Sequence, residues 1–427
     1  MEKTNTLTEF LKNSWTMYHA LANAKAILED NGFSPLSEAV DWEIIEGGKY
    51  YIERGASLIA FAVGGLDNFH YKIAASHLDS PMLKLKENPA VKSGGCVTLN
   101  VETYGGGVWY SFFDKPLKIA GQVVKNQNGR LVKETVTSSY FVTIPSQAIH
   151  INRNANEGFS VNPQVDLQPL FSLDTEDAEH TLLTSLCGEE RIISYDLFAV
   201  SAQEPYEFGV NGEFIAAPRI DNLTSVYASL EALISHADSD GVCVAAFFNH
   251  EEIGSRTPQG ACGDFLENAL RRIAYALRFD DSEYYKALLS SFLLSVDNAH
   301  ALHPNHPEKS DITNKTKLGG GIAIKSHANG AYATDALSSA VVKTVLEKAG
   351  VKYQSFFNRS DARSGSTLAM AALSRFGVNG ADIGLPQLAM HAACECFAKD
   401  DYTEMVNGLT AFFSSDLLFE DGGILIG

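Results

Sequence analysis

Acidic and histidine side chains follow predicted strands at five places along this chain. These residues are His77 and Asp79, Asp221, Glu251 and Glu252, Asp297 and His300, and His391. A single Asp in such a position usually caps a helix or forms a turn. Five such places together favour a functional site, because ligands of open α/β sheets bind outside the carboxyl ends of the strands.

The residue types in this set are those of a divalent metal site. Imidazoles and carboxylates without a thiolate suit zinc, manganese or cobalt. The set exceeds the ligands of one tetrahedral ion, so the simplest assembly holds two ions that share a bridging carboxylate. Two such ions, ~3.5–4 Å apart, acidify a water between them. His77 and Asp79 point to one face of an extended chain, so Asp79 can hold the imidazole of His77 rather than bind metal.

The adjacent acids Glu251 and Glu252 need a physical reason, since neighbouring carboxylates repel each other. Adjacent residues that leave a strand point in different directions, so one can bind a metal while the other faces the attacking water. A general base for that water lies within hydrogen-bond reach but outside the coordination sphere. From this segment alone, a solvated acidic turn before a helix stays an alternative.

Alternating strands and helices must position these side chains. Apolar, β-rich runs predict strands at Ser57–Gly64, His70–Asp79, Val242–Asn249 and Ser291–Asp297. Apolar residues at helical spacing predict helices at Leu7–Asn31, Ser225–Ala237, Ala333–Gly350 and Gly365–Gly377. This alternation predicts an α/β fold in which helices flank a central mixed sheet.

A different pattern interrupts the α/β part. From Lys84 to about Ser201 the chain has short β runs and Gly-rich turns, with a hairpin signal at Asn128-Gly129. We therefore expect a catalytic α/β domain made of residues 1–85 and 206–427, and an inserted β-rich domain at residues 86–205.

Composition limits the partners that we expect. The chain has 427 residues and a formal net charge of -19, so nucleic acid and anionic membranes are not expected partners. Its six cysteines are scattered and form no disulfide framework. No run approaches the ~20 apolar residues that span a membrane, and the N-terminus lacks the apolar core of a signal peptide. We expect a soluble, cytoplasmic protein.

Five segments, in order, resemble the aspartyl aminopeptidase family of metallopeptidases: SHLDSP, PRIDN, NHEEIGS, SVDNAHALHPN and PQLAMHAACE. The resemblance covers essentially the whole chain and implies two zinc ions, with Mn²⁺ or Co²⁺ as alternatives. His77, Asp221 and Asp297 match the ligands of one ion. Asp221 also matches the bridge to the second ion, which Glu252 and His391 complete.

The same resemblance implies roles for the remaining residues. Glu251 matches the general base, and Asp79 matches the acid behind the histidine ligand. His300 and Lys325 resemble substrate-contacting positions, and His150 resembles a histidine that is inserted into the active site of a neighbouring subunit. The implied fold is a catalytic α/β domain with an inserted β-rich dimerisation domain, whose dimers assemble into a dodecamer.

The implied activity is removal of one N-terminal residue from a peptide with a free amino group. Pairing of Lys325 with an acidic substrate side chain would give a preference for Asp or Glu. A related di-metal deacylase or carboxypeptidase is one alternative, and it would not require a free amine. A catalytically silent peptide-binding assembly is the other, although the presence of every matched ligand and of the base argues against it.

Overall fold

The structure is a computed structural model of the chain. It describes residues 3–188, 190–235, 239–362, 365, 367–368, 377–420 and 423–427. Most of the helix predicted at Gly365–Gly377 lies outside these residues. Within the described part of the chain, no helix is long and apolar enough to cross a membrane.

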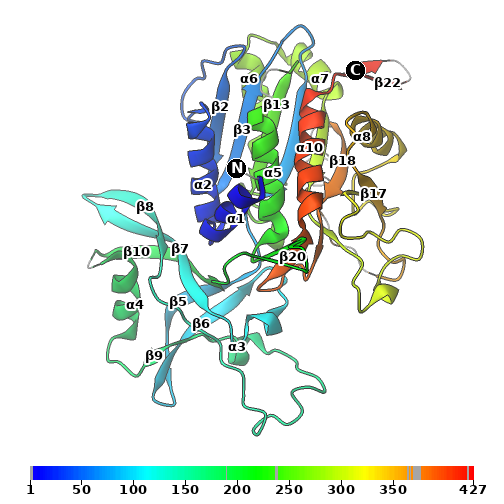
Figure 1. The fold of residues 1–427 in the computed structure, drawn as a ribbon. Coiled ribbons are helices and arrows are strands. Elements are labelled where there is room, and N and C mark those ends of the chain that lie inside the picture. Colours follow the sequence, from blue (N-terminus) through cyan, green and yellow to red (C-terminus); the bar gives the residue numbers. More distant parts are fainter. Residues whose placement is uncertain are drawn as a thin grey trace.

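A mixed sheet forms the centre of the molecule, as the sequence predicts, and it has nine strands (Figure 1). In spatial order its strands are β1 (Ser34–Pro35), β2 (Lys49–Arg54), β3 (Ser57–Val63), β13 (Val242–Phe248), β4 (Tyr71–His77), β14 (Phe292–Val296), β18 (Asn379–Gly384), β16 (Ile322–Lys325) and β17 (Tyr353–Phe356). The four central strands β13, β4, β14 and β18 run parallel. The neighbours of this group, β3 and β16, are antiparallel to it.

Helices cover both faces of this sheet. On one face lie α1 (Lys3–Asn13), α2 (Met17–Asp30), α5 (Ile220–Ser235), α8 (Ala336–Lys348) and α10 (Lys399–Ser414), and on the other lie α6 (Phe265–Ala276) and α7 (Asp281–Leu289). Side chains of β3 alternate between the two cores: Leu58 and Ala60 join the first, and Ile59 and Phe61 join the second. This double coverage explains why the central strands are nearly continuous apolar runs.

A separate antiparallel sheet of six strands has its own apolar core. Its strands, in spatial order, are β8 (Arg130–Thr137), β7 (Leu117–Gln127), β10 (Ile192–Ser201), β5 (Met82–Ser93), β6 (Cys96–Tyr104) and β9 (Leu170–Leu173). The short helices η1 (Trp109–Phe112), α3 (Pro163–Asp166) and α4 (Ala178–Cys187) accompany it. Asn128 and Gly129 join β7 to β8 with φ of 54° and 87°, which is the turn that their sequence favours.

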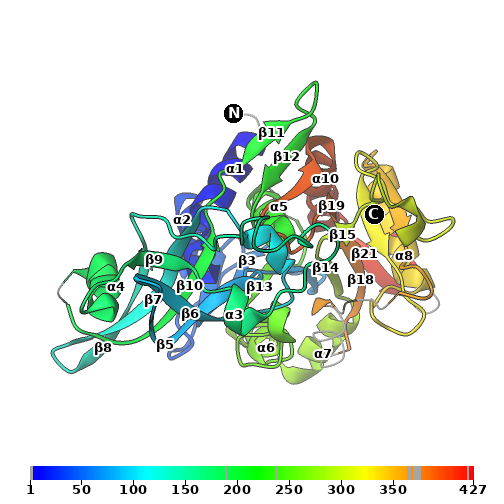
Figure 2. The same cartoon turned by 90° about the horizontal axis from the view of Figure 1, so that it is seen from below.

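A third sheet of five short strands lies at the lower end of the central sheet, where Figure 2 views the molecule from below. Its strands are β11 (Tyr206–Phe208), β12 (Phe214–Ala217), β20 (Glu395–Ala398), β19 (Pro386–Leu388) and β15 (Ala299–His300). The remaining elements are η2 (Glu251–Ile253), η3 (Pro307–Lys309) and the terminal hairpin of β21 (Leu417–Glu420) and β22 (Gly423–Ile426).

Candidate metal centre

The carboxyl ends of three adjacent parallel strands supply half of the candidate site. His77 is the last residue of β4, and Phe248 lies opposite it at the end of β13. The acids Glu251 and Glu252 follow in η2, directly after β13, and Asp297 follows β14. Because β4 lies between β13 and β14, these side chains meet at one edge of the sheet.

The other half of the site comes from the five-stranded sheet. Asp221 is the second residue of α5, shortly after β12, and His391 lies in the turn between β19 and β20. Strands β12 and β20 pair antiparallel, which places Ala217 opposite Glu395 and so brings the two segments together. Neither backbone is regular at the site: Asp221 has non-helical torsions, and His391 has a φ of 66°.

The carboxylate of Asp221 faces both imidazoles. Its Oδ1 lies 3.4 Å from Nε2 of His77, and its Oδ2 lies 3.2 Å from Nε2 of His391. Nε2 of His77 is also 3.5 Å from Oδ1 of Asp297, and Nε2 of His391 is 3.3 Å from Oε1 of Glu252. Two groups of donors therefore share Asp221: His77–Asp221–Asp297 and Asp221–Glu252–His391.

Backbone contacts fix both imidazoles in the orientation that a metal ligand needs. Nδ1 of His77 lies 3.0 Å from the carbonyl oxygen of Asp79, and Nδ1 of His391 lies 2.8 Å from the carbonyl oxygen of Gly106. When Nδ1–H donates to these carbonyls, the lone pair of each Nε2 faces the carboxylates. This tautomer is the common one for histidines that bind a metal.

The donor set fits divalent metal ions. Oδ1 of Asp221 and Oε1 of Glu252 are buried and have no hydrogen-bond partner among the described residues. Leaving such acceptors unsatisfied is costly, whereas a cation between the converging donors would satisfy them. Imidazole and carboxylate are both ligands of zinc. Glu251 forms a third such group with His77 and Glu252, so it too lies within reach of a metal ion.

The charged groups of the site strongly perturb one another. Burial lowers the pKa of His391, but Asp221 and Glu252 outweigh it and raise the pKa to about 10. Burial also lowers the pKa of His77, but Asp221 and Asp297 outweigh this effect and hold the pKa well above its usual value. Burial, together with Asp297 and Asp79, raises the pKa of Glu251 to about 7. A metal must therefore displace protons from the two histidines.

Asp79 holds the backbone of the acidic pair. Its Oδ1 accepts the N–H of Glu251 and its Oδ2 accepts the N–H of Glu252, each at 3.1 Å. The hydroxyl of Tyr104, at the end of β6, donates to Oδ2 at 2.7 Å. The carboxylate lies 3.5 Å from Nδ1 of His77, farther than the carbonyl oxygen of the same residue. Tyr104 is absent from the residues predicted from the sequence.

A pocket of about 310 Å³ opens beside these donors. Its lining includes His77, Asp221, Glu251, Asp297, His300, Lys325, Tyr332, Phe356, Thr367, Met390 and His391. The Nζ atom of Lys325 is buried, 3.7 Å from Oδ2 of Asp297 and 3.2 Å from the carbonyl oxygen of Asn298. Burial lowers the pKa of Lys325, but Asp297 and Tyr332 raise it above the usual value.

His150 does not line this pocket. It lies in an exposed turn between the β-bridge at Ile144 and helix α3. One copy of the chain therefore brings nine of the ten predicted residues around the pocket or directly behind it and leaves His150 outside. Its insertion into a neighbouring subunit stays a prediction.

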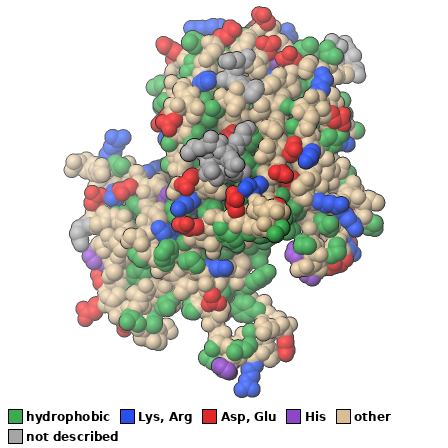
Figure 3. Space-filling view, in the orientation of Figure 1, with side chains coloured by type: hydrophobic (Ala, Val, Ile, Leu, Met, Phe, Trp, Pro, Cys, Tyr) green, Lys and Arg blue, Asp and Glu red, His purple; other side chains and the backbone are tan. Residues whose placement is uncertain are grey.

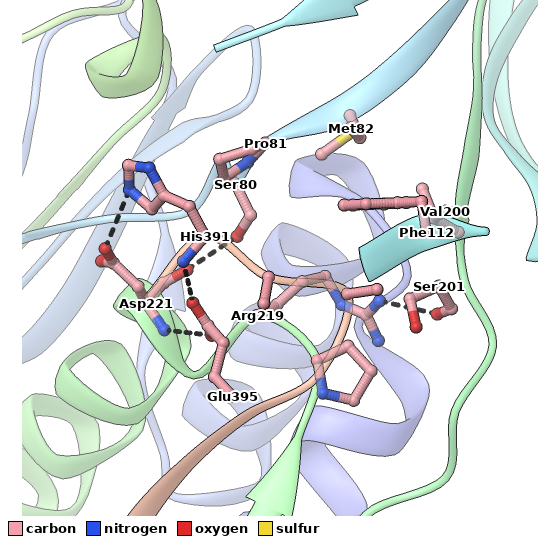
Figure 4. A pocket seen from close by; sticks show the side chains of 13 residues that line it. Ser80, Pro81, Met82, Phe112, Val200, Ser201, Arg219, Asp221, His391 and Glu395 are labelled. Atoms are coloured by element: carbon pink, nitrogen blue, oxygen red, sulfur yellow. Dashed lines mark hydrogen bonds and ion pairs between the residues drawn. The ribbon is translucent and has the colours of Figure 1, made fainter. Parts of the chain in front are cut away.

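A second residue that the sequence did not indicate is Glu395, the first residue of β20. Figure 4 shows its carboxylate beside the backbones of Asp221 and His391. Burial and the charge of Asp221 raise the pKa of Glu395 to about 8, whereas these two N–H donors favour the ionised form. Beside it is a small cavity of about 20 Å³, whose lining includes Ser80, Arg219 and Ala393.

Comparison with known proteins places the chain in one family. The family profile "Aminopeptidase I zinc metalloprotease (M18)" matches residues 10–413. A "Probable M18 family aminopeptidase 2" of Clostridium acetobutylicum is 37% identical over 428 residues, covering 97% of this chain and 99% of the relative. A protein of the same name from Pseudomonas entomophila is 37% identical over 422 residues, covering 96% of this chain and 97% of the relative.

Solved structures agree with this assignment. A chain in the cryo-EM structure of the Ape4 and Nbr1 complex is 32% identical, with a TM-score of 0.92, and the match covers 96% of this chain and 85% of that one. The M18 aminopeptidase of Thermotoga maritima is 26% identical, with a TM-score of 0.84 and coverage of 96% and 95%. A chain in the structure of the S. cerevisiae mApe1 dodecamer is 26% identical, with a TM-score of 0.84, and the match covers 96% of each chain. The chain therefore belongs to the M18 family of zinc metallopeptidases and is a metalloaminopeptidase.

Proposed function

We propose that this enzyme holds two zinc ions and removes the N-terminal residue of peptides that have a free amino group, with a preference for Asp or Glu. The observation that carries the proposal is the position of Asp221, each of whose two carboxylate oxygens faces a different imidazole. A shared carboxylate between two histidines is the arrangement that a pair of ions requires. Mn²⁺ and Co²⁺ suit the same donors.

The residues divide into two groups of ligands and a base. His77, Asp221 and Asp297 would hold one ion, and Asp221, Glu252 and His391 would hold the other. The bound ions would polarise the scissile carbonyl and acidify the attacking water.

Glu251 accepts a proton from that water and returns it to the leaving amine. Burial raises the pKa of this carboxyl above the usual value for a glutamate, which makes Glu251 a stronger base. His300, in the pocket wall, donates a hydrogen bond to the oxyanion of the tetrahedral intermediate. Asp79 keeps the backbone of the acidic pair in place.

The acidic preference rests on Lys325. It is a buried cation in the wall of the pocket, within 3.7 Å of Asp297. A substrate carboxylate that reaches Nζ would complete the neutralisation of this ammonium group at low local dielectric. A neutral substrate side chain would leave the hydrogen-bonding capacity of Nζ unused, so it would bind less well.

Self-association into dimers and then a dodecamer is part of the same proposal. One matched structure is a dodecamer of mApe1. Large apolar side chains exposed within residues 86–205 are Tyr110, Leu131, Phe141, Ile149, Ile151, Phe159, Val165, Leu173 and Ile193. In Figure 3, hydrophobic side chains reach the surface over this lower, β-rich part. We assign this segment as the dimerisation domain, with residues 1–85 and 206–427 as the catalytic domain, and we place the enzyme in the cytoplasm.

The test is a panel of unblocked dipeptides and aminoacyl-arylamides, assayed on metal-stripped enzyme reloaded with zinc, manganese or cobalt. We expect turnover only with a free amino group, and faster turnover when the first residue is Asp or Glu. Equal cleavage of N-acetylated peptides would instead support the deacylase or carboxypeptidase alternative. No turnover with any first residue would leave the silent peptide-binding assembly.

A further inference from the structure

One buried carboxylate connects two segments of the proposed second ion site. Oε2 of Glu395 accepts the backbone N–H of Asp221 at 3.0 Å, and Oε1 accepts that of His391 at 2.6 Å. The side-chain amide of Gln387 also approaches Oε1, at 3.3 Å. Glu395 is 2% exposed, so water does not compete for these bonds. Both ligands are thus held through their main chains by the same side chain.

This arrangement repeats the one on the other side of the site. Asp79 accepts the two N–H groups of Glu251 and Glu252 in the same way. The four residues held by these two carboxylates include the base and all three ligands of the proposed second ion. Each carboxylate acts on the backbone, behind the side chains that face the pocket.

The turn that carries His391 depends on such outside contacts. Ala389 and His391 have φ of 57° and 66°, a left-handed conformation that costs a residue with a β-carbon ~1–2 kcal/mol. Within the turn the N–H of Ala392 donates to the carbonyl of Ala389. Three further contacts hold it: Gly106 accepts from Nδ1 of His391, the N–H of Val108 donates to the carbonyl of His391, and Glu395 accepts the N–H of His391. Of these three contacts, only that of Glu395 also reaches Asp221.

We propose that Glu395 is a positioning residue that sets the distance between Asp221 and His391 and thereby the affinity of the second metal ion. The inference rests on the proposed two-ion function. Glu395 touches neither an ion nor the substrate, and acts through the two N–H groups alone. The first ion depends on Glu395 only through the shared Asp221, because its other two ligands, His77 and Asp297, lie at the ends of strands of the central sheet.

The test compares Glu395→Gln with a matched control, Asp401→Asn. Gln has the size of Glu but only one acceptor atom, so its amide group would face one of the two N–H donors. Asp401 is a buried carboxylate that accepts the N–H groups of Gly319 and Gly321, each at 2.7 Å. It therefore reports the cost of the same chemical change at a place away from the ligands.

The readout is zinc content and zinc affinity, measured by competition with a chromophoric chelator on the full-length enzyme. We expect the parent and Asp401→Asn to bind two ions with the same affinities. Glu395→Gln should bind the second ion about 10–100-fold more weakly, and the first ion should lose less affinity because His77 and Asp297 still hold it. The visible spectrum of cobalt-loaded protein should lose mainly the contribution of the second ion. An excess of cobalt should restore the spectral contribution of the second ion.

Two ions bound with unchanged affinity in Glu395→Gln would overturn the inference and leave the two-ion function intact. A parent that binds one ion would contradict the proposed function itself. If Glu395→Gln does not fold, Glu395→Asp serves in its place: the shorter carboxylate cannot span both N–H groups. Normal second-ion affinity in that variant would overturn the inference equally.

Discussion

Glu251 and Glu252 offer a sharp test, because they are adjacent, chemically identical and assigned unlike roles. The substitutions are Glu251→Gln and Glu252→Gln, which keep the size of each side chain and remove its charge. If Glu251 is the base, its replacement should leave both ions bound. Glu252, whose Oε1 lies 3.3 Å from Nε2 of His391, is instead the proposed ligand. The geometry that also places Glu251 close to His77 and Glu252 makes the opposite assignment a genuine rival.

The expected effect on activity follows from the role of a general base. Loss of such a group lowers the rate ~10²–10⁴-fold, equivalent to about 3–5 kcal/mol of transition-state stabilisation. Glu251→Gln should therefore lose that much kcat while two ions remain bound. Glu252→Gln should lose one ion, and added zinc should restore part of its activity.

The raised pKa of Glu251 also predicts how the stability of the metal-free protein changes with pH. Burial raises this pKa from 4.5 to about 7, so the metal-free fold gains stability from the protonated carboxyl below pH 4.5 and loses it as the pH rises through 7. Above pH 7 the ionised group costs about 3 kcal/mol. In metal-free protein, Glu251→Gln should therefore unfold at a higher temperature than the parent at pH 8, and the difference should shrink towards pH 5.

The assays are zinc content by atomic spectroscopy, steady-state kinetics with an acidic dipeptide, and thermal unfolding of stripped protein at several pH values. Loss of an ion in Glu251→Gln, with both ions retained in Glu252→Gln, would refute the division of roles. A stability difference that is constant between pH 5 and pH 8 would refute the electrostatic reasoning about Glu251.

Three further outcomes are expected. Chelation should lower the thermal midpoint of the parent, because the clustered carboxylates lose their cations; an unchanged midpoint after verified metal removal would contradict this. Zinc affinity should rise from pH 6 to pH 8, and zinc binding should release protons, because the raised pKa values of His391 and His77 keep both imidazoles protonated in metal-free protein. Calorimetry in buffers of different ionisation enthalpy measures the number of protons released on zinc binding. If no protons are released, the two histidines are not protonated in the metal-free protein. Lys325→Met should cost ~2–5 kcal/mol in kcat/KM for substrates that begin with Asp or Glu, and much less for those that begin with Leu; an equal loss for both classes would remove Lys325 from specificity.

The sequence was sufficient to predict the strand ends. The apolar runs of β4, β13 and β14 are unambiguous, and parallel strands must present their carboxyl ends at one edge. His77, the acidic pair and Asp297 are therefore expected together from the sequence alone. The hairpin at Asn128-Gly129 was also predictable, because the turn depends only on those two adjacent residues.

The contacts of Glu395 and Tyr104 could not be predicted in this way. Glu395 is 174 residues from Asp221 in the chain, and nothing in its own neighbourhood distinguishes it from a solvated acid. The five-stranded sheet that brings the two together has strands of only two to four residues, such as Ala299–His300, which leave no periodic pattern. The left-handed turn at Ala389 and His391 contains no glycine that would signal it.

The proposed second ion lies between two sheets, and this position has a consequence for the mechanical integrity of the enzyme. An ion held by Glu252 and His391 would tie the end of the central sheet to the five-stranded sheet, and so act as a removable cross-link. Unlike a disulfide, this cross-link is absent from the unfolded chain, so its strength is set by mass action. Each tenfold rise in free zinc above the dissociation constant would add about 1.4 kcal/mol to the work of separating the two sheets. Free zinc would therefore govern how readily this joint opens, independently of turnover.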